Sequence, residues 1–448
     1  MANTYLQRTP SSATNRKTFT WSGWVKRSSL GQNYFFSQGS ANSDNFAILF
    51  NGSDQFYFWD YHGSWDFEFK TNAKYRDLNS WYHIVVAIDT TQATQSNRVK
   101  AYINGEQITS WSTASYPSQN DDTRVNNTTA VRVGRYTDAA YYDGLMSHVH
   151  FIDGTAYQAS DFGEYDANGV WKIKTSPSVT YGTNGFFILK DGNSGTDQSP
   201  NTNNFTVGGG TLTKTEDNPS NVFATMNPLD NYWQGSTFSN GNNTIVTGSN
   251  SATFNTSTLL MTSGKYYVEV KPTVGSATLN IGVTGEQAVS ASQTLASRGS
   301  GYAYLDSSGV FNNGSSVGGT FNSYSNGDII GIAINLDDEQ GGLNKLYFSK
   351  NGVWQNGADP STPSSTTGVV GITKPSNLTG GGSKMGAYAF AINETWDDNT
   401  RTVQWNFGNG YFGTSAISSA GTNASGNGIF EYDVPTGYTA LSTKGLNL

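Results

Sequence analysis

The chain has no cysteine and few charged residues. None of its 448 residues is Cys, which excludes disulfide bonds, thiolate metal sites and cysteine nucleophiles. Charged side chains make up only 13% of the sequence, about half the share that is usual in a globular domain. Its solubility must therefore depend on neutral polar residues, mainly Asn, Ser, Thr and Gly.

Other absences narrow the range of partners. No apolar run reaches the roughly 18 residues that a membrane-spanning helix needs, and the first ten residues lack the apolar core of a signal peptide. The net charge is −8, and no Lys/Arg cluster is present that could neutralise several phosphates. We expect no membrane insertion, no export through a signal peptide and no nucleic acid partner.

Aromatic residues and glycine are abundant instead. The sequence contains 11 Trp, 25 Tyr, 24 Phe and 51 Gly. Disordered chains are also polar, but they have few aromatic residues because they bury no core. This chain is therefore expected to fold, and its length corresponds to two or three domains of about 100 to 200 residues each.

The local pattern is that of β-structure. Short β-branched or aromatic runs alternate with Gly, Asn and Asp, and helical periodicity is almost absent. Asn-Gly pairs, which tolerate the positive φ of tight hairpin turns, recur along the chain, for example at Asn104–Gly105 and Asn351–Gly352. The sequence predicts an all-β protein with two antiparallel β-sandwich domains in tandem, of the jelly-roll or concanavalin A-like kind.

Predicted strands form two groups separated by a segment rich in turn-forming residues. The first group covers 18–26, 46–50, 55–59, 83–89, 99–103, 131–135 and 145–152. The second group covers 265–271, 278–283, 301–305, 328–336, 345–349, 385–392 and 402–407. The segment between them is poor in core residues and includes a run of three glycines, 208–210. We predict domains over 1–200 and 226–448 and a linker over 201–225.

Ordered motifs give each half a family resemblance. The first half resembles a LamG domain of the concanavalin A-like lectin/glucanase superfamily in four segments: Trp21–Val25, Trp81–Val86, Val99–Gly105 and Asp143–Val149. The second half is similar to a SPRY domain in three: Gly264–Val270, Asp328–Ala333 and Leu346–Gly352. The resemblance implies two lectin-like or binding sandwiches, although such a fold does not by itself define a function.

Two further stretches, Asp217–Pro228 and Pro435–Thr443, are similar to stretches of marine bacteriophage virion proteins that carry this pair of domains. The resemblance implies a virion protein that is made in the host bacterial cytoplasm and released by lysis. We expect a tail-fibre or receptor-binding type that recognises a host surface glycan or protein, contacts other virion proteins and forms a homo-oligomer. A head decoration or accessory protein that binds the capsid or tail surface is the alternative.

Catalytic motifs lack the context that they need. Gly314–Gly318 matches the G-x-S-x-G nucleophile elbow and Gly408–Gly413 matches the G-x-G-x-x-G phosphate loop, but neither stands between a strand and a helix. The Glu-x-Asp-x-x-Glu motif of laminarinase-like relatives, which supplies the paired carboxylates of glycoside hydrolysis, is absent. We predict no enzymatic activity, no catalytic residues and no cofactor, with a glycan hydrolase as the remaining alternative.

Two features of the sequence could bind a metal ion: a pair of histidines and the loops rich in Asp and Asn. His148 and His150 lie two residues apart on a predicted strand, so both rings would project from one face. Because few other ligands are near them in the sequence, we interpret them as solvent-facing histidines and predict no metal site. Loops rich in Asp and Asn could supply oxygen ligands for calcium, and the LamG resemblance keeps that alternative open.

Exposed aromatic side chains are the candidate ligand-binding residues. In a hairpin predicted to turn near Gly63, strand alternation places Tyr57, Trp59 and Tyr61 on one face and two phenylalanines on the other. If the Phe face is core, the Tyr/Trp face could stack on sugar rings or fill a domain or subunit contact. The full candidate set is Tyr57, Trp59, Tyr61, Trp65, Tyr136, Tyr141, Tyr142, Trp354 and Trp396.

Overall fold

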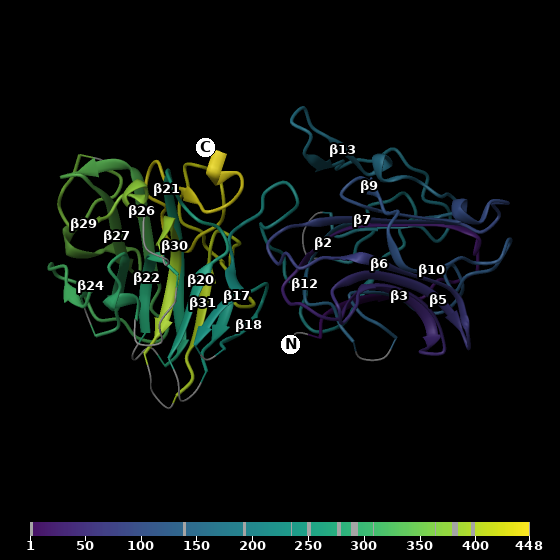
Figure 1. The fold of residues 1–448 in the computed structure, drawn as a ribbon, viewed down its shortest axis with the longest axis horizontal. Coiled ribbons are helices and arrows are strands. Elements are labelled where there is room, and N and C mark those ends of the chain that lie inside the picture. The colour runs from purple at the N-terminus through teal and green to yellow at the C-terminus, as the bar shows by residue number, and fades with distance from the viewer. Residues whose placement is uncertain are drawn as a thin grey trace. The chain divides into compact units, whose positions relative to one another are not determined.

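The computed structural model describes residues 3–137, 140–190, 194–233, 235–248, 252–275, 279–287, 294–307, 309–362, 364–378, 384–395 and 399–447. The chain divides into two compact units, the first comprising Met1–Lys214 and Asn218–Ser220 and the second Thr215–Asp217 and Asn221–Leu448. Strands dominate both units (Figure 1). The helices in the described ranges are short 3-10 turns: η1 (Gln95–Asn97), η2 (Ala159–Asp161), η3 (Leu295–Ser297), η4 (Gln355–Gly357), η5 (Pro375–Asn377) and η6 (Gly445–Asn447).

The first unit is a sandwich of an eight-stranded and a six-stranded antiparallel sheet. The eight-stranded sheet has the order β10 (Trp111–Ser115), β6 (Trp65–Lys74), β5 (Gln55–His62), β4 (Asp44–Phe50), β3 (Asn33–Ala41), β11 (Val131–Val133), β1 (Tyr5–Arg8) and β16 (Thr206–Gly209). The six-stranded sheet has the order β15 (Phe186–Ile188), β12 (Gly144–Asp153), β2 (Thr18–Arg27), β7 (Tyr82–Asp89), β8 (Val99–Ile103) and β9 (Glu106–Gln107). Figure 1 shows the two layers, with β2 and β7 in one and β3 and β5 in the other.

Phenylalanines fill the space between these sheets. Phe56 and Phe58 of β5 and Phe67 of β6 are fully buried and belong to the same apolar cluster as Trp21 of β2. Tyr57 and the other odd-numbered residues of β5 point to the opposite side of the sheet, as the period of two requires. The predicted hairpin is confirmed, because β5 pairs with β6 and Gly63 adopts the positive φ of the turn.

The outer face of the six-stranded sheet is covered by the chain that follows β12. Phe162 and Tyr181 pack there against Phe187 of β15, next to the small sheet formed by β13 (Gly163–Tyr165) and β14 (Trp171–Ile173). The expectation of a solvent-facing histidine pair is wrong for His150, which is 2% exposed and hydrogen-bonds the Tyr181 hydroxyl through Nδ1 at 2.9 Å. The strand alternation fails because a register shift between Ser147 and His150 interrupts the pairing of β12 with β2.

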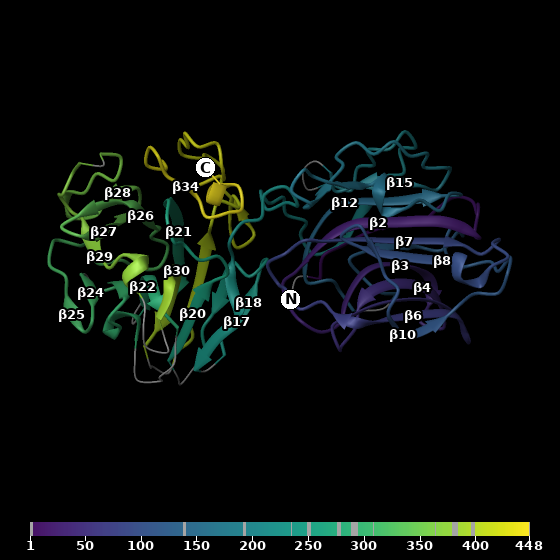
Figure 2. The same ribbon diagram turned by 45° about the horizontal axis from the view of Figure 1, so that its top comes forward.

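The second unit is also a sandwich (Figure 2). Its seven-stranded sheet has the order β17 (Met226–Trp233), β20 (Thr253–Ser257), β30 (Lys384–Glu394), β22 (Leu279–Glu286), β23 (Gly301–Leu305), β24 (Val310–Asn312) and β25 (Ser315–Ser316). Its nine-stranded sheet has the order β18 (Thr237–Ser239), β19 (Thr244–Val246), β31 (Thr402–Asn406), β21 (Lys265–Val274), β26 (Ile330–Gln340), β27 (Leu343–Lys350) and β28 (Val353–Trp354), with β29 (Val370–Ile372) beside β27 and β34 (Thr439–Ala440) parallel to β21. Both fold-class predictions, all-β and tandem sandwiches, are confirmed.

Within the second unit, residues 221–228 of the stretch Asp217–Pro228 lie beside the stretch Pro435–Thr443. The Ala224 N–H donates to the Leu441 carbonyl at 2.9 Å, and the Thr443 N–H donates to the Val222 carbonyl at 2.9 Å. Phe223 packs in one apolar cluster with Tyr438 and other residues of the C-terminal segment, 417–447. The beginning and the end of this unit therefore close on each other.

The two catalytic motif matches fall in hairpins. Ser315 and Ser316 form β25, an exposed edge strand paired with β24. Tyr411–Phe412 forms β32, which pairs with β33 (Ser415–Ala416). The range 201–225, predicted as a linker, contains β16, which pairs with β1, and the division between the units lies after it, at residues 214–221.

Candidate binding face

An aromatic cluster lies on the side of the eight-stranded sheet that faces away from the six-stranded sheet. We call this the outer aromatic face, and it comprises Tyr34, Tyr57, Trp59, Tyr61, Trp65 and Tyr136. Cross-strand pairing brings these residues together, since Trp59 of β5 pairs with Glu68 of β6 and Tyr61 pairs with Trp65. The core phenylalanines occupy the other side of the same strands.

The rings of the outer aromatic face support one another. Trp59 and Trp65 meet edge to face with ring centroids 6.1 Å apart, and Tyr61 lies 4.8 Å from Trp65. Tyr136 stacks on Tyr34 at 4.6 Å. The Trp59 Nε1–H donates to Asn45 Oδ1 at 2.9 Å, which fixes the indole orientation. Edge-to-face and offset-stacked contacts of this kind stabilise a rigid arrangement.

The side chains of the outer aromatic face differ in solvent exposure and form an exposed layer and a buried layer. Trp65 is 49% exposed, whereas Trp59 is 6% and Tyr57 is 9% exposed. Tyr61 and Tyr136 are half-buried. Tyr57 and Trp59 point to the predicted side of the sheet, but they form an inner layer, because Tyr136 folds over β3 and packs against Trp59 with ring centroids 6.0 Å apart. The rings available to a ligand are those of Trp65, Tyr61 and Tyr136.

An ion pair lies among these rings. Lys70 Nζ is 2.6 Å from Glu68 Oε1 and 4.5 Å from the centre of the Tyr57 ring. The Tyr57 hydroxyl also donates to Glu68 Oε1, at 2.7 Å. Burial alone would raise the pKa of Glu68, but the hydrogen bonds from Lys70 and Tyr57 outweigh it and hold the pKa below its usual value. Glu68 is therefore ionised near neutral pH.

A second charged group lies at the turn end of the hairpin. Arg124 contacts Asp44 at 3.3 Å and Asp66 at 2.9 Å, and His62 Nδ1 lies 2.9 Å from Asp44 Oδ1. Asp60 is different, because it is fully buried and its Oδ1 accepts the Arg124 backbone N–H at 2.9 Å. Burial raises the pKa of Asp60 well above its usual range, although the Arg124 charge opposes the shift.

The remaining candidate residues do not join the outer aromatic face. Tyr142 is a core residue whose hydroxyl donates to the Lys26 carbonyl at 2.6 Å. Tyr141 lies beside Tyr5, and the Arg135 guanidinium sits over both rings, at 5.5 Å and 4.6 Å. Trp354 belongs to the second unit, where it packs near Tyr267, and Trp396 lies outside the described residues.

The sequence analysis missed one residue of the outer aromatic face, Tyr34, and the neighbouring ion pair of Glu68 and Lys70. Tyr34 lies on β3, a strand that was not predicted, and Glu68 and Lys70 became candidates only through their pairing with β5. The alternation of Phe67 and Phe69 with Glu68 and Lys70 along β6 is the signal that could have placed the ion pair on the aromatic side. No comparable pattern in the sequence shows that the loop with Tyr136 folds over β3.

A Ser–His contact lies on the six-stranded sheet, between β2 and β7. Ser22 Oγ lies 2.9 Å from His83 Nε2, and Trp171 Nε1–H donates to His83 Nδ1 at 3.0 Å. Burial lowers the pKa of His83 to about 3. Both Ser22 and His83 are at most 1% exposed, and the position of an orienting carboxylate is taken by an indole, so this pair lacks the access and the acid that a catalytic triad needs.

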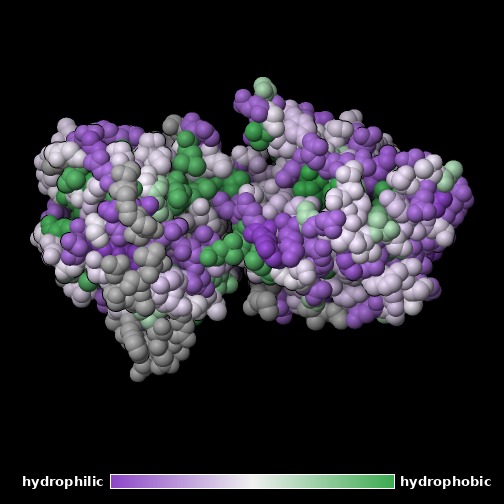
Figure 3. Space-filling view, in the orientation of Figure 1, coloured by the Kyte–Doolittle hydropathy of each residue, from purple (hydrophilic) through white to green (hydrophobic). Residues whose placement is uncertain are grey.

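Across the described residues, no group of three or more His, Asp or Glu side chains could hold a metal ion. No helix in the same ranges is long and apolar enough to cross a membrane. The face of the first unit visible in Figure 3 is mostly hydrophilic or of intermediate hydropathy, with apolar residues in small separate patches.

Comparison with known proteins places the first unit in a fold family. A family model described as the concanavalin A-like lectin/glucanases superfamily matches residues 1–160. The first unit therefore has the LamG-like, concanavalin A-like fold that its motifs predicted. The comparison with curated proteins finds no match.

Solved structures similar to the chain include SPRY and laminin G domains. The SPRY domain of human HERC1 is 16% identical and covers 40% of this chain and 96% of its own, with a TM-score of 0.29. Domains LG4-5 of the mouse laminin α1 chain are 9% identical and cover 97% and 94%, with a TM-score of 0.29. Domain 4 of AbnA, a GH43 extracellular arabinanase from Geobacillus stearothermophilus, in complex with arabinotriose, is 18% identical and covers 32% and 64%, with a TM-score of 0.26. At these identities and TM-scores the likeness carries no inference about a ligand.

Proposed function

We propose that the protein is a non-enzymatic recognition protein whose first unit binds a surface glycan through the outer aromatic face. LamG-like domains bind glycans or proteins, and the observation that carries the proposal is the half-exposed indole of Trp65, which rests on Trp59 and Tyr61. A ring that is already held in place loses little conformational freedom on binding, so its contact area contributes efficiently to affinity. A sugar ring that stacks on Trp65 would therefore contact an indole that is already held in place.

Polar groups beside Trp65 suit a glycan better than an apolar partner. Asp44 and His62 are hydrogen-bonded near the hairpin turn, and the side chains of both are partly exposed, 30% and 62% respectively. Lys70 is also 30% exposed. These side chains offer hydrogen-bond donors and acceptors to hydroxyl groups, whereas an aliphatic partner would leave them unpaired.

The protonation states of the carboxyl groups favour binding over hydrolysis. A glycosidase needs a protonated carboxyl group in its cleft as the general acid. Glu68 is held ionised by Lys70 and Tyr57, and Asp60, whose pKa is raised, is fully buried. Incubation of the purified chain with bound polysaccharide should release no product, and product release would favour the hydrolase alternative.

Binding by the full chain to an array of bacterial surface polysaccharides tests the proposal. We expect Trp65→Ala to weaken binding by about tenfold or more, equivalent to ~1.4 kcal/mol, because the exposed stacking surface is lost. Tyr165→Ala is the matched control, since Tyr165 is 48% exposed in the same unit but lies on β13. Equal affinities of the wild type and Trp65→Ala would contradict the proposal.

We also propose that recognition takes place on the surface of a bacteriophage particle, as in a tail-fibre or receptor-binding protein. The support is the resemblance of Asp217–Pro228 and Pro435–Thr443 to stretches of marine bacteriophage virion proteins. Particles imaged with antibody against this chain should carry the label on the tail. Label scattered over the head would favour the decoration alternative, and unlabelled particles would contradict a virion location.

A further inference from the structure

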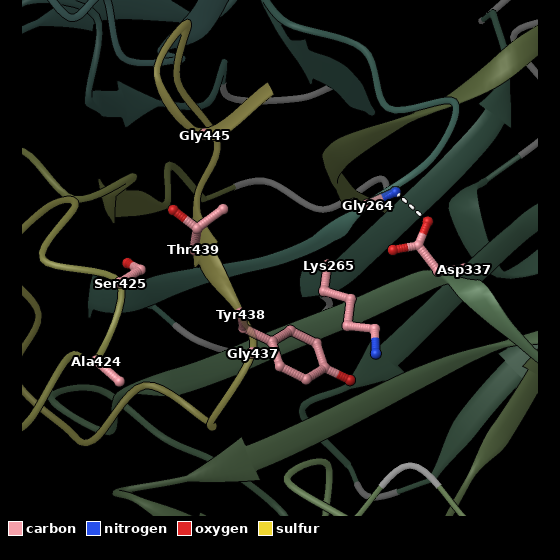
Figure 4. A pocket seen from close by; sticks show the side chains of 9 residues that line it. All are labelled: Gly264, Lys265, Asp337, Ala424, Ser425, Gly437, Tyr438, Thr439 and Gly445. Carbon is pink, nitrogen blue, oxygen red and sulfur yellow. Dashed lines mark hydrogen bonds between the residues drawn. The ribbon is translucent and has the colours of Figure 1, made fainter. Parts of the chain in front are cut away.

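A pocket of about 530 Å³ opens in the second unit where the C-terminal segment passes the start of β21 (Figure 4). Gly264, Lys265 at the start of β21 and Asp337 of β26 line one side, and Ser425 and Tyr438 of the C-terminal segment line the other. Part of the pocket is thus built by Pro435–Thr443, a stretch to which the proposed glycan site gives no role.

In this pocket the lysine has an ion-pair partner, whereas the carboxylate of Asp337 has none among the described residues. Lys265 Nζ lies 2.8 Å from Asp338 Oδ2, which also accepts the Asn335 side-chain amide at 2.6 Å. Asp337 accepts the Gly264 N–H at 2.6 Å through Oδ1 alone. No described residue donates a hydrogen bond to Asp337 Oδ2. The one lysine of the pocket is therefore already paired, and one carboxylate oxygen is available.

Tyr438 forms part of the pocket wall. It is 2% exposed overall, and Figure 4 shows its ring next to Lys265 at the pocket. Burial is the main cause of its raised pKa, and the nearby Tyr347 and the carboxylates of Asp338 and Asp337 add to the shift. Because so little of the side chain is exposed, its π-face is not open to a ligand, and the charge of Asp337 is what favours a cation.

The lining leaves room for an alkyl chain. Gly437, at φ +87°, has no atom within 4 Å of the position that a Cβ would take, and Ala424 lines the same side of the pocket. A lysine side chain needs an opening for its ammonium group and contact for its methylene stem. A carboxylate or phosphate ligand would instead be repelled by the negative charge of Asp337, which has no cationic partner among the described residues of the pocket.

We propose that this pocket binds a primary ammonium group at the end of an alkyl chain, as in a lysine side chain of a partner protein. The ammonium group pairs with Asp337 Oδ2, while the methylene stem contacts Ala424. The site is independent of the outer aromatic face, because all of its residues belong to the second unit.

Calorimetric titration of the full chain with acetyl-lysine methylamide tests this site. Acetyl-norleucine methylamide has a similar stem without the charge, and we expect it to bind at least about tenfold more weakly. Asp337→Asn keeps an acceptor for the Gly264 N–H but removes the charge, so it should weaken binding of the lysine probe by about tenfold. Asp77→Asn is the control, since Asp77 also accepts backbone N–H groups but lies in the first unit.

The same titration distinguishes a cation site from an anion site. Lys265→Gln should leave binding of the lysine probe unchanged or strengthened, because it releases Asp338 from its ion pair. Acetyl-glutamate methylamide should not bind. Binding of the glutamate probe, or equal binding of the lysine and norleucine probes, would overturn the proposal, provided that each variant keeps the wild-type thermal unfolding midpoint.

Discussion

His83 lies between the rings of Trp24 and Trp171, with ring centroids 4.8 Å and 5.9 Å away. Its neutral form accepts the Trp171 N–H, and burial lowers its pKa to about 3 from 6.5. Between these two pH values the unfolded chain binds more protons than the folded chain. The free energy of unfolding therefore falls as the pH falls from 6.5 to 3, by up to about 1.4 kcal/mol per pH unit from this residue.

Replacing His83 by Asn tests this dependence. We expect His83→Asn to be less stable than the wild type at pH 7 but to lose stability less steeply on acidification, as measured by urea unfolding at several pH values. His150 remains as a second buried neutral imidazole, so the slope should decrease without vanishing. Equal slopes in the wild type and the variant would contradict the assignment.

Asp60 and Asp54 are buried aspartates with opposite pKa shifts. Burial raises the pKa of Asp60, so its contribution to stability declines as the pH rises above the usual value of 3.8. For Asp54, hydrogen bonds from Gly31, Arg76 and Arg27 outweigh burial and lower the pKa, so its contribution is lost as the pH falls below 3.8 towards the folded value.

The corresponding Asn variants should change stability in opposite directions. Asp60→Asn should raise the free energy of unfolding at pH 8, because it removes a buried ionisable group, and this gain should shrink at pH 4. Asp54→Asn should lower it by about 3 kcal/mol at pH 7, because Arg27, with no exposed side-chain surface, loses its ion-pair partner. Thermal unfolding of both variants at the two pH values is the measurement, and a loss of stability in Asp60→Asn at pH 8 would contradict the account.

At the scale of elements, one carboxylate ties the C-terminal segment to β21. Glu269 accepts the backbone N–H groups of Glu431 and Tyr432, each at 2.9 Å, together with the Asn406 amide at 3.1 Å. Burial outweighs these hydrogen bonds and raises the pKa of Glu269 to about 7 from 4.5. Because the folded chain holds this proton more tightly, the contribution to stability is complete below pH 4.5 and declines up to pH 7.

Glu269→Gln should therefore destabilise the second unit most at low pH. Glutamine offers one acceptor oxygen instead of two, and an N–H left without an acceptor costs about 1 to 3 kcal/mol. We expect the difference from the wild type in urea unfolding to be larger at pH 5 than at pH 8. Glu339→Gln is the control and should have little effect, because Glu339 forms an exposed ion pair with Lys374. If the loss of stability in Glu269→Gln grew with rising pH, the predicted direction of the Glu269 contribution would be wrong.

The elements were predictable where hydrophobic alternation is regular. The ranges predicted for β8 and β23 coincide with the strands. β3 was missed because both of its faces are buried and its alternation is broken. A register shift between Tyr34 and Phe36 lets the consecutive residues Phe35 and Phe36 both join the core, which removes the period of two. β16 was taken as linker because its four residues, Thr206–Gly209, include two glycines and no strong core residue.

The site was only partly predictable for a related reason. Alternation along β5 identifies the side of the sheet on which Tyr57, Trp59 and Tyr61 lie. It cannot show that Tyr136, which follows β11, folds back over β3 and makes Trp59 an inner residue. Likewise, the pocket of the second unit depends on contacts between β21 and residues more than 150 positions later. Such long-range contacts leave no local pattern.

At the scale of the whole molecule, the chain combines little charge with a surface of neutral polar residues. Charged residues make up 13% of the sequence, and the visible surface in Figure 3 has no large apolar area on the first unit. A recognition protein of this composition has to bind through a few placed rings and hydrogen bonds, since its net charge of −8 would repel the acidic polysaccharides that a basic surface would attract.

The most direct test of glycan binding at the outer aromatic face is fluorine NMR of the full chain labelled with 5-fluorotryptophan. Trp65→Phe assigns the Trp65 resonance among the 11 tryptophans. Adding a polysaccharide that binds the protein should shift or broaden the Trp65 signal, and that of Trp59 to a smaller extent, while the signals of Trp171 and Trp354 stay in place. A bound polysaccharide that leaves Trp65 unchanged would contradict the assignment of the binding face.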